Sequence, residues 1–180
     1  MLHATLQAIG MARQLWLLRH ADAEPHGTRE DAKRLLTERG EQQARIAGVA
    51  LARIGESFEA VLFSPKVRAR QTAEIAAAQW SEHERAKLAE HAPLASGFDG
   101  AQALDAMAPI AADGRLLLVG HEPDLSRVIG ELTGARADVK KGGLAVIRLE
   151  GAGGELLVLM RPRELALIAG GVHGAPVHGE

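Results

Sequence analysis

Residues 15–24 read LWLLRHADAE, an apolar run that ends abruptly at Arg19 and His20. The run from Gln14 to Arg19 is short and continuous, which is typical of a strand that is buried on both faces. Runs of the same kind recur at 60–63 (AVLF) and 116–119 (LLLV). Each is followed by a segment with helical signals, and this alternation predicts a mostly parallel sheet with helices on its faces.

The segments after the apolar runs carry helix signals of several kinds. Apolar residues at helical spacing predict a helix over 40–54 that Gly55 ends. Ser64-Pro65 is typical of a capped helix start, so a second helix is expected from there to about Trp80. Further helices are predicted over 99–111, from Pro123 to a cap at Gly134, and over 163–169.

The C-terminal part of the chain has a different pattern. Segments 144–149 and 155–160 flank the glycine-rich stretch 151–154, which predicts a β-hairpin. The charged stretch 81–93 gives only a weak signal for a short strand near 87–90. Together with the earlier elements, the hairpin predicts a three-layer α/β/α sandwich whose mostly parallel central sheet has an antiparallel edge.

We expect one domain over residues 13–170, preceded by a loose N-terminal extension at 1–12 and followed by a flexible tail at 171–180. Ligands of such sheets bind at the carboxyl ends of the strands. The residues that directly follow the strands are therefore the candidate functional residues.

The composition of the 180 residues excludes several classes of function. There is no Cys, which rules out disulfides, thiolate nucleophiles and Cys-type metal centres and fits a reducing, cytoplasmic location. With 21 Lys and Arg against 23 Asp and Glu, the formal charge is −2, and aromatic residues make up 3%. These values argue against a dedicated nucleic-acid or anionic-membrane binder. No apolar run reaches the ~18 residues of a membrane span.

Three segments bring Arg and His side chains to one edge of the predicted sheet. Arg19 and His20 end the first strand, Arg68 lies in the first turn after the second, and His121 directly follows the third. Arg presents a planar fork that matches two phosphate oxygens, and a neutral imidazole is a nucleophile that nearby cations keep unprotonated. The sequence therefore predicts an oxyanion site. Because no aspartate array for magnesium accompanies it, we expect no metal and no cofactor.

These residues lie in motifs that resemble the signatures of the histidine phosphatase superfamily, the phosphoglycerate-mutase-like enzymes. LWLLRHADAE at 15–24 resembles the first signature, SPKVRARQTAE at 64–74 the second and LLLVGHEPDLS at 116–126 the third. RLLTERG at 34–40 and the short chain are most similar to the small SixA-type branch, which is named for phosphohistidine phosphatase activity. The resemblance implies a phosphoglycerate-mutase-like fold without the inserted lid of larger relatives.

The resemblance also implies a role for each matching residue. His20 would be the nucleophile that becomes transiently phosphorylated, and Arg19 and Arg68 would clamp the phosphoryl oxygens. His121 would donate a hydrogen bond to the phosphoryl group, and Arg34 would reach the phosphate from the loop side. Water would then hydrolyse the phosphoenzyme without a metal or cofactor.

A general acid is the part of the family's machinery with no clear match. Mutase-like relatives supply a Glu from a segment after the second helix, where this chain lacks the surrounding pattern. Glu122 and Asp22 are the two candidates near the predicted site, although Glu122 precedes Pro123 and would equally cap a helix. A phosphoramidate such as phosphohistidine needs an acid less than an ester does, because its bond is weaker.

The resemblance and the predicted site favour a metal-independent phosphatase that acts on phosphohistidine in a partner protein. A phosphatase of small phosphorylated metabolites is the alternative within enzymes. A non-catalytic module that binds phosphoproteins is disfavoured, since binding would not require a nucleophile. His26, with Asp22 and Glu24 nearby, could suggest a metal site, but a solvated loop explains this polar stretch better.

Overall fold

The computed structural model describes residues 12–55 and 57–170. The predicted tail at 171–180 and all but residue 12 of the predicted extension at 1–12 lie outside these residues. A six-stranded sheet forms the centre, with the strand order β3-β2-β4-β1-β5-β6. Its strands are β1 (Gln14–Arg19), β2 (Ala60–Phe63), β3 (Leu88–Glu90), β4 (Arg115–Gly120), β5 (Leu144–Glu150) and β6 (Gly153–Met160).

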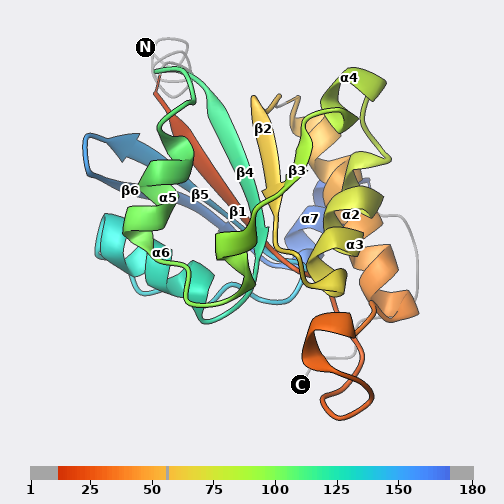
Figure 1. The fold of residues 1–180 in the computed structure, drawn as a ribbon. Coiled ribbons are helices and arrows are strands. Elements are labelled where there is room, and N and C mark those ends of the chain that lie inside the picture. The colour runs from red at the N-terminus through yellow and green to blue at the C-terminus, as the bar shows by residue number, and fades with distance from the viewer. Residues whose placement is uncertain (1–11, 56, 171–180) are drawn as a thin grey trace.

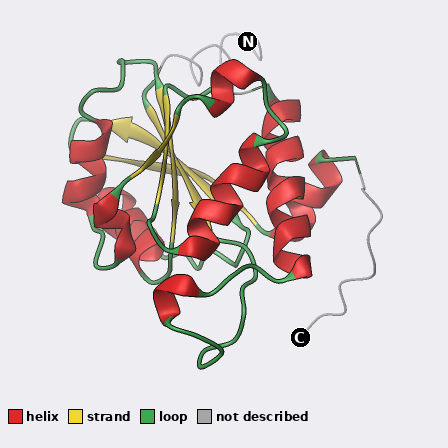
Figure 2. Ribbon diagram, turned by 45° about the vertical axis from the view of Figure 1, so that its right-hand side comes forward, coloured by secondary structure: helices red, strands yellow, loops and turns green. Residues whose placement is uncertain are grey.

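Strands β1 to β4 run parallel to one another, whereas β5 pairs antiparallel with β1 and with β6. Helices α5 and α6 cover one face of the sheet, and α2, α3 and α7 cover the other (Figures 1 and 2). The helices are α2 (Glu38–Ile54), α3 (Val67–Ala77), α4 (Glu82–Arg85), α5 (Gly100–Met107), α6 (Asp124–Thr133) and α7 (Pro162–Ile168), with short 3-10 turns at η1 (Asp31–Lys33) and η2 (Ala92–Ala95). The predicted three-layer α/β/α sandwich with an antiparallel edge is confirmed.

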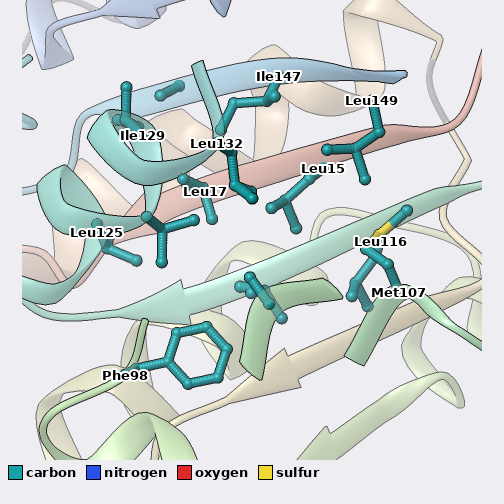
Figure 3. Close-up of a cluster of buried hydrophobic side chains, with 14 of the residues drawn as sticks. Leu15, Leu17, Phe98, Met107, Leu116, Leu125, Ile129, Leu132, Ile147 and Leu149 are labelled. Atoms are coloured by element: carbon teal, nitrogen blue, oxygen red, sulfur yellow. The ribbon is translucent and has the colours of Figure 1, made fainter. Parts of the chain in front are cut away.

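The continuous apolar runs are explained by two separate hydrophobic cores. Leu15 and Leu17 of β1 belong to the core under α5 and α6, which Figure 3 shows in close-up. Trp16 and Leu18 point to the opposite face and belong to the core under α2, α3 and α7. Because successive strand residues face opposite sides, a strand that is covered on both faces must be apolar throughout.

A close backbone approach fixes α3 against α2. A Cβ atom on Gly48 of α2 would clash with the carbonyl oxygen of Ala76 in α3, so only glycine fits there. The indole nitrogen of Trp80, just after α3, donates to the Gly48 carbonyl at 3.0 Å. This contact anchors the helix whose first turn carries Arg68.

The sequence placed several helix boundaries incorrectly. Helix α3 begins at Val67 rather than at Ser64-Pro65 and ends at Ala77 rather than near Trp80. Helix α2 begins two residues before Gly40, where the hydroxyl of Thr37 accepts from the Gly40 amide at 3.1 Å. Helix α5 covers 100–107 rather than 99–111, and α4 was not predicted. The expected C-caps at Gly55 and Gly134 are confirmed, each with a positive φ.

Within the residues that the structure describes, no helix combines the length and the apolar character needed to cross a membrane.

Candidate active site

The carboxyl ends of β2, β4 and β1 lie side by side and bring the predicted site residues together. Arg19 at the end of β1 is in register with Gly120 of β4, and Phe63 of β2 pairs with Val119 of β4. The residues that come next in the chain, His20, His121 and Ser64, therefore emerge at one edge of the sheet. The predicted convergence of three segments is confirmed at the level of strand order.

A cavity of about 420 Å³ opens at this edge. All four side chains predicted to form the oxyanion site line this cavity: Arg19, His20, Arg68 and His121. Arg34 and Glu122 also line it. Asp22 does not line it. The cavity is lined by Arg19, His20, Ala23, Glu24, Pro25, His26, Asp31, Arg34, Lys66, Arg68, His121, Glu122 and Lys141.

His20 is buried and held in a defined tautomer. Its Nδ1 lies 2.7 Å from the carbonyl oxygen of Ala21, which can only accept, so Nδ1 carries the proton. Its Nε2 accepts from Nε of Arg68 at 3.3 Å. Burial, together with the charges of Arg68 and Arg19, lowers the pKa of His20 to about 3. The ring is therefore neutral near pH 7, with the lone pair of Nε2 directed toward the Arg68 guanidinium.

His121 faces His20, with their ring centroids 5.1 Å apart. Its Nε2 lies 2.7 Å from the hydroxyl of Ser64, while its buried Nδ1 has no partner among the described residues. Burial, with the neighbouring charges, lowers the pKa of His121 to about 2. A buried nitrogen without a partner at a pocket is a group that a bound ligand would satisfy.

Ser64 is a site residue that the sequence analysis assigned to helix capping. It is fully buried, and the cap position of α3 belongs to Lys66 instead. Its hydroxyl accepts from the Lys66 amide at 3.3 Å and contacts His121. Its position directly after β2 could have identified Ser64 as a residue near the site, because residues that directly follow parallel strands lie at the same edge of the sheet.

Arg19 approaches the pocket from the end of β1, and Arg68 approaches it from the first turn of α3. Nε of Arg19 is buried without a partner among the described residues, while its NH1 donates to the Val139 carbonyl at 2.8 Å. Arg68, only 4% exposed, donates through NH1 to the Asp31 main-chain carbonyl at 2.7 Å. Arg19 is thus held by a carbonyl outside the pocket and Arg68 by the pocket-lining Asp31, and each guanidinium has further N–H groups that can donate to an oxyanion.

The segment 24–34, read from the sequence as a solvated loop, forms one wall of the pocket. Figures 1 and 2 show it beyond the carboxyl ends of the central strands. A bridge between Ala23 and Leu36 closes its base, and NH1 of Arg34 donates to the Glu24 carbonyl at 2.6 Å. His26 is 86% exposed, as expected, yet it lines the pocket. Asp31 was not predicted as a site residue.

The two acid candidates from the sequence have other partners. Asp22 binds Nζ of Lys141 at 2.8 Å and the hydroxyl of Thr37 at 3.0 Å, and these bonds outweigh burial and lower its pKa. Glu122 accepts from the amide and hydroxyl of Ser126 and from the amide of Val139. The structure therefore favours the capping interpretation of Glu122.

The described residues contain no group of three or more His, Asp or Glu side chains arranged to hold a metal ion. The cationic side chains of Arg19, Arg68, Arg34 and Lys66 line the pocket.

Comparison with known proteins gives the family. The family model described as Histidine phosphatase superfamily (branch 1) matches residues 15–93, which include β2, α3 and all of β1 except its first residue. An uncharacterized protein of Picosynechococcus sp. is 34% identical over 170 residues, covering 84% of this chain and 98% of that protein. The chain belongs to the histidine phosphatase superfamily.

Several solved structures have the same fold as this chain. The tungstate complex of the protein histidine phosphatase SixA matches with a TM-score of 0.72 at 23% identity, over 84% of this chain and 99% of that one. A SixA protein from Nakamurella multipartitia matches with a TM-score of 0.68 at 26% identity, over 83% of this chain and 96% of that one. An alpha-ribazole phosphatase from Shigella flexneri matches with a TM-score of 0.60 at 22% identity, over 83% of this chain and 96% of that one. One fold thus serves several substrates, so the substrate must be argued from the site.

Proposed function

We propose that this histidine phosphatase is a metal-independent phosphohydrolase that works through a phosphohistidine intermediate on His20. The observation that carries the proposal is the hydrogen-bond geometry of the His20 ring. Its Nδ1–H is fixed on the Ala21 carbonyl, so the neutral ring has its lone pair on Nε2, beside Arg68. A buried neutral imidazole that faces a guanidinium is prepared to attack a phosphorus atom whose oxygens that guanidinium holds.

The proposed reaction has two displacements. The lone pair of His20 Nε2 forms a bond to phosphorus, and the bond from phosphorus to the leaving group breaks with its electron pair going to that group. Arg19 and Arg68 bind the phosphoryl oxygens, and the unpartnered Nδ1 of His121 is the proposed donor to a third oxygen. A water then attacks phosphorus and releases one proton to solvent, which balances the proton that the leaving group takes from water. The P–N bond returns its electron pair to Nε2 of His20, and inorganic phosphate leaves. Arg34, paired with Asp31, borders the phosphate from the loop side.

Phosphohistidine on a protein is the substrate that we propose. Asp22 lies outside the pocket and Glu122 is occupied by three hydrogen bonds, so neither is placed to protonate an ester oxygen. An imidazole leaving group can instead take its proton from water. The solvent-exposed rim at His26 would admit a side chain presented by another protein.

A phosphatase of small phosphorylated metabolites is the second candidate. The structural match to the alpha-ribazole phosphatase supports it, because that protein's name shows that the fold accepts a small phosphate ester. A non-catalytic phosphoprotein-binding module is the third, and turnover distinguishes it.

A substrate panel tests these proposals. With a chelator present, we expect turnover of a phosphohistidine peptide with a kcat/KM at least about tenfold above that for sugar phosphates and nucleotides, since only the esters require a general acid. The preference would be measured as phosphate release under initial-rate conditions. Faster hydrolysis of a sugar phosphate would contradict the phosphohistidine assignment, and no turnover of any substrate would favour the binding module.

Ser64 is proposed as a positioning residue that acts through His121. Ser64→Ala is expected to lower kcat about tenfold with little change in KM, because the His121 ring loses the hydroxyl that fixes its orientation and tautomer. Initial rates and a melting curve would be measured beside Ser81→Ala, whose serine caps the short helix α4 away from the pocket. A KM that rises with no loss of kcat would instead assign Ser64 to substrate binding.

A further inference from the structure

Three cationic side chains of the pocket converge on the carboxylate of Asp31. Its Oδ1 accepts from Arg34, through Nε at 3.0 Å and NH2 at 2.8 Å. Its Oδ2 accepts from Nζ of Lys66 at 3.1 Å and from NH2 of Arg68 at 3.3 Å. These donors are of the kind that phosphate oxygens use. The pocket thus contains an anion that the chain itself supplies.

The Asp31 carboxylate is ionised and can be displaced. Burial by itself would raise the pKa of Asp31, but hydrogen bonds from Arg34 and Lys66 hold that pKa well below its usual range. The side chain is 45% exposed, and it lies in the short turn η1 at the pocket rim rather than in the hydrophobic core. It could therefore move toward solvent without opening the fold.

The orientation of Arg68 does not depend on this carboxylate alone. NH1 of Arg68 donates to the main-chain carbonyl of Asp31 at 2.7 Å, and Nε contacts His20. Both bonds would remain if the side chain of residue 31 were neutral. The side-chain charge therefore adds little to the placement of the guanidinium, but it occupies donors that a phosphoryl group would use.

Building on the proposed function, we propose that Asp31 is an internal counter-anion of the phosphate site and determines how tightly that site holds phosphate. Its carboxylate occupies donors of Arg68 and Lys66, and a phosphoryl dianion displaces it from them. When inorganic phosphate forms, the returning carboxylate competes for the same donors and promotes product release. Like charges a few ångströms apart in a partly desolvated pocket repel strongly, which makes the two anions alternatives.

The binding of inorganic phosphate at pH 7, measured by titration calorimetry, tests this inference directly. Asp31→Asn is expected to bind phosphate about tenfold more tightly than wild type, because one negative charge next to the site is removed while a side-chain acceptor is kept. The matched control is Glu30→Gln, which removes the same charge one residue away. Glu30 pairs with Lys33 at 2.8 Å and does not line the pocket, so its substitution should leave phosphate affinity within about twofold of wild type.

The phosphate affinities of the variants decide whether Asp31 acts as a counter-anion. Unchanged or weaker phosphate binding by Asp31→Asn, with measurable binding by wild type, overturns the counter-anion role and leaves the proposed function standing. Equal tightening by Glu30→Gln overturns it as well, since the effect would then belong to net charge. Asp31→Ser, a second neutral variant, must agree with Asp31→Asn, and melting curves confirm that both are folded. Absence of phosphate binding and of phosphatase turnover in wild type would overturn both proposals together.

Discussion

Replacing His20 with Ala is expected to lower kcat/KM by about 10³-fold or more for every phosphorylated substrate, because no other described side chain places an unprotonated imidazole nitrogen against Arg68. The measurement is initial-rate turnover together with rapid acid-free trapping of ³²P. Wild type should retain label that is labile in acid and stable in base, whereas His20→Ala should retain none.

The matched control for this substitution is His83→Ala, on the exposed helix α4 away from the pocket. It should keep wild-type turnover and labelling. Labelling that persists in His20→Ala would move the nucleophile to another residue, with His121 the next to be tested.

The low pKa of His20 also predicts how the rate should respond to pH. Burial and the adjacent cations lower that pKa to about 3, so the nucleophile is unprotonated above that value and is lost as pH falls through it. Titration of His20 itself therefore should not shape the rate between about pH 5 and pH 8. A slope in that range would belong to the substrate or to another group.

Arg68→Lys is expected to be nearly as damaging as Arg68→Ala, with kcat/KM lowered by about 10²–10³-fold in both. Three different nitrogens of Arg68 donate in three directions, to His20 and to two oxygens of Asp31. A lysine ammonium keeps the charge but not the planar fork, so it cannot hold the loop and the phosphoryl oxygens in one geometry. Steady-state kinetics on an aryl phosphate would measure the loss.

Arg70→Lys provides the comparison within the same helix. Arg70 is partly exposed and pairs with Glu90 at 2.6 Å, outside the pocket, so this change should alter kcat/KM by less than about twofold. If Arg68→Lys retained most of the wild-type rate, charge alone would suffice and the clamp proposed for Arg68 would be wrong.

The strands and the main pocket residues could be predicted because their signals are local. The apolar runs at 14–19 and 60–63 became β1 and β2 with the same bounds. His20 and His121 directly follow strands, so a parallel sheet is enough to bring them together. Helix ends were predicted less well, as at α3, where the start expected at Ser64 lies at Val67.

The partners of the polar residues could not be predicted from local patterns. Ser64 contacts His121 across 57 residues, and Asp31 contacts Arg68 across 37. Glu122 could be read from the sequence as a cap or an acid, and only its contacts with Ser126 and Val139 favour the cap.

The sequence by itself therefore determined the layered fold and the four side chains that share its pocket, since strand burial and motif position are properties of short segments. Only the tertiary structure decided which nitrogen of His20 faces the pocket, that Ser64 contacts His121, and that Asp31 lies among the pocket cations. Those features depend on how the segment 24–34 and the start of α3 fold over the sheet edge. Hydrogen bonds act over about 3 Å, so they are decided only when distant segments have taken their final positions.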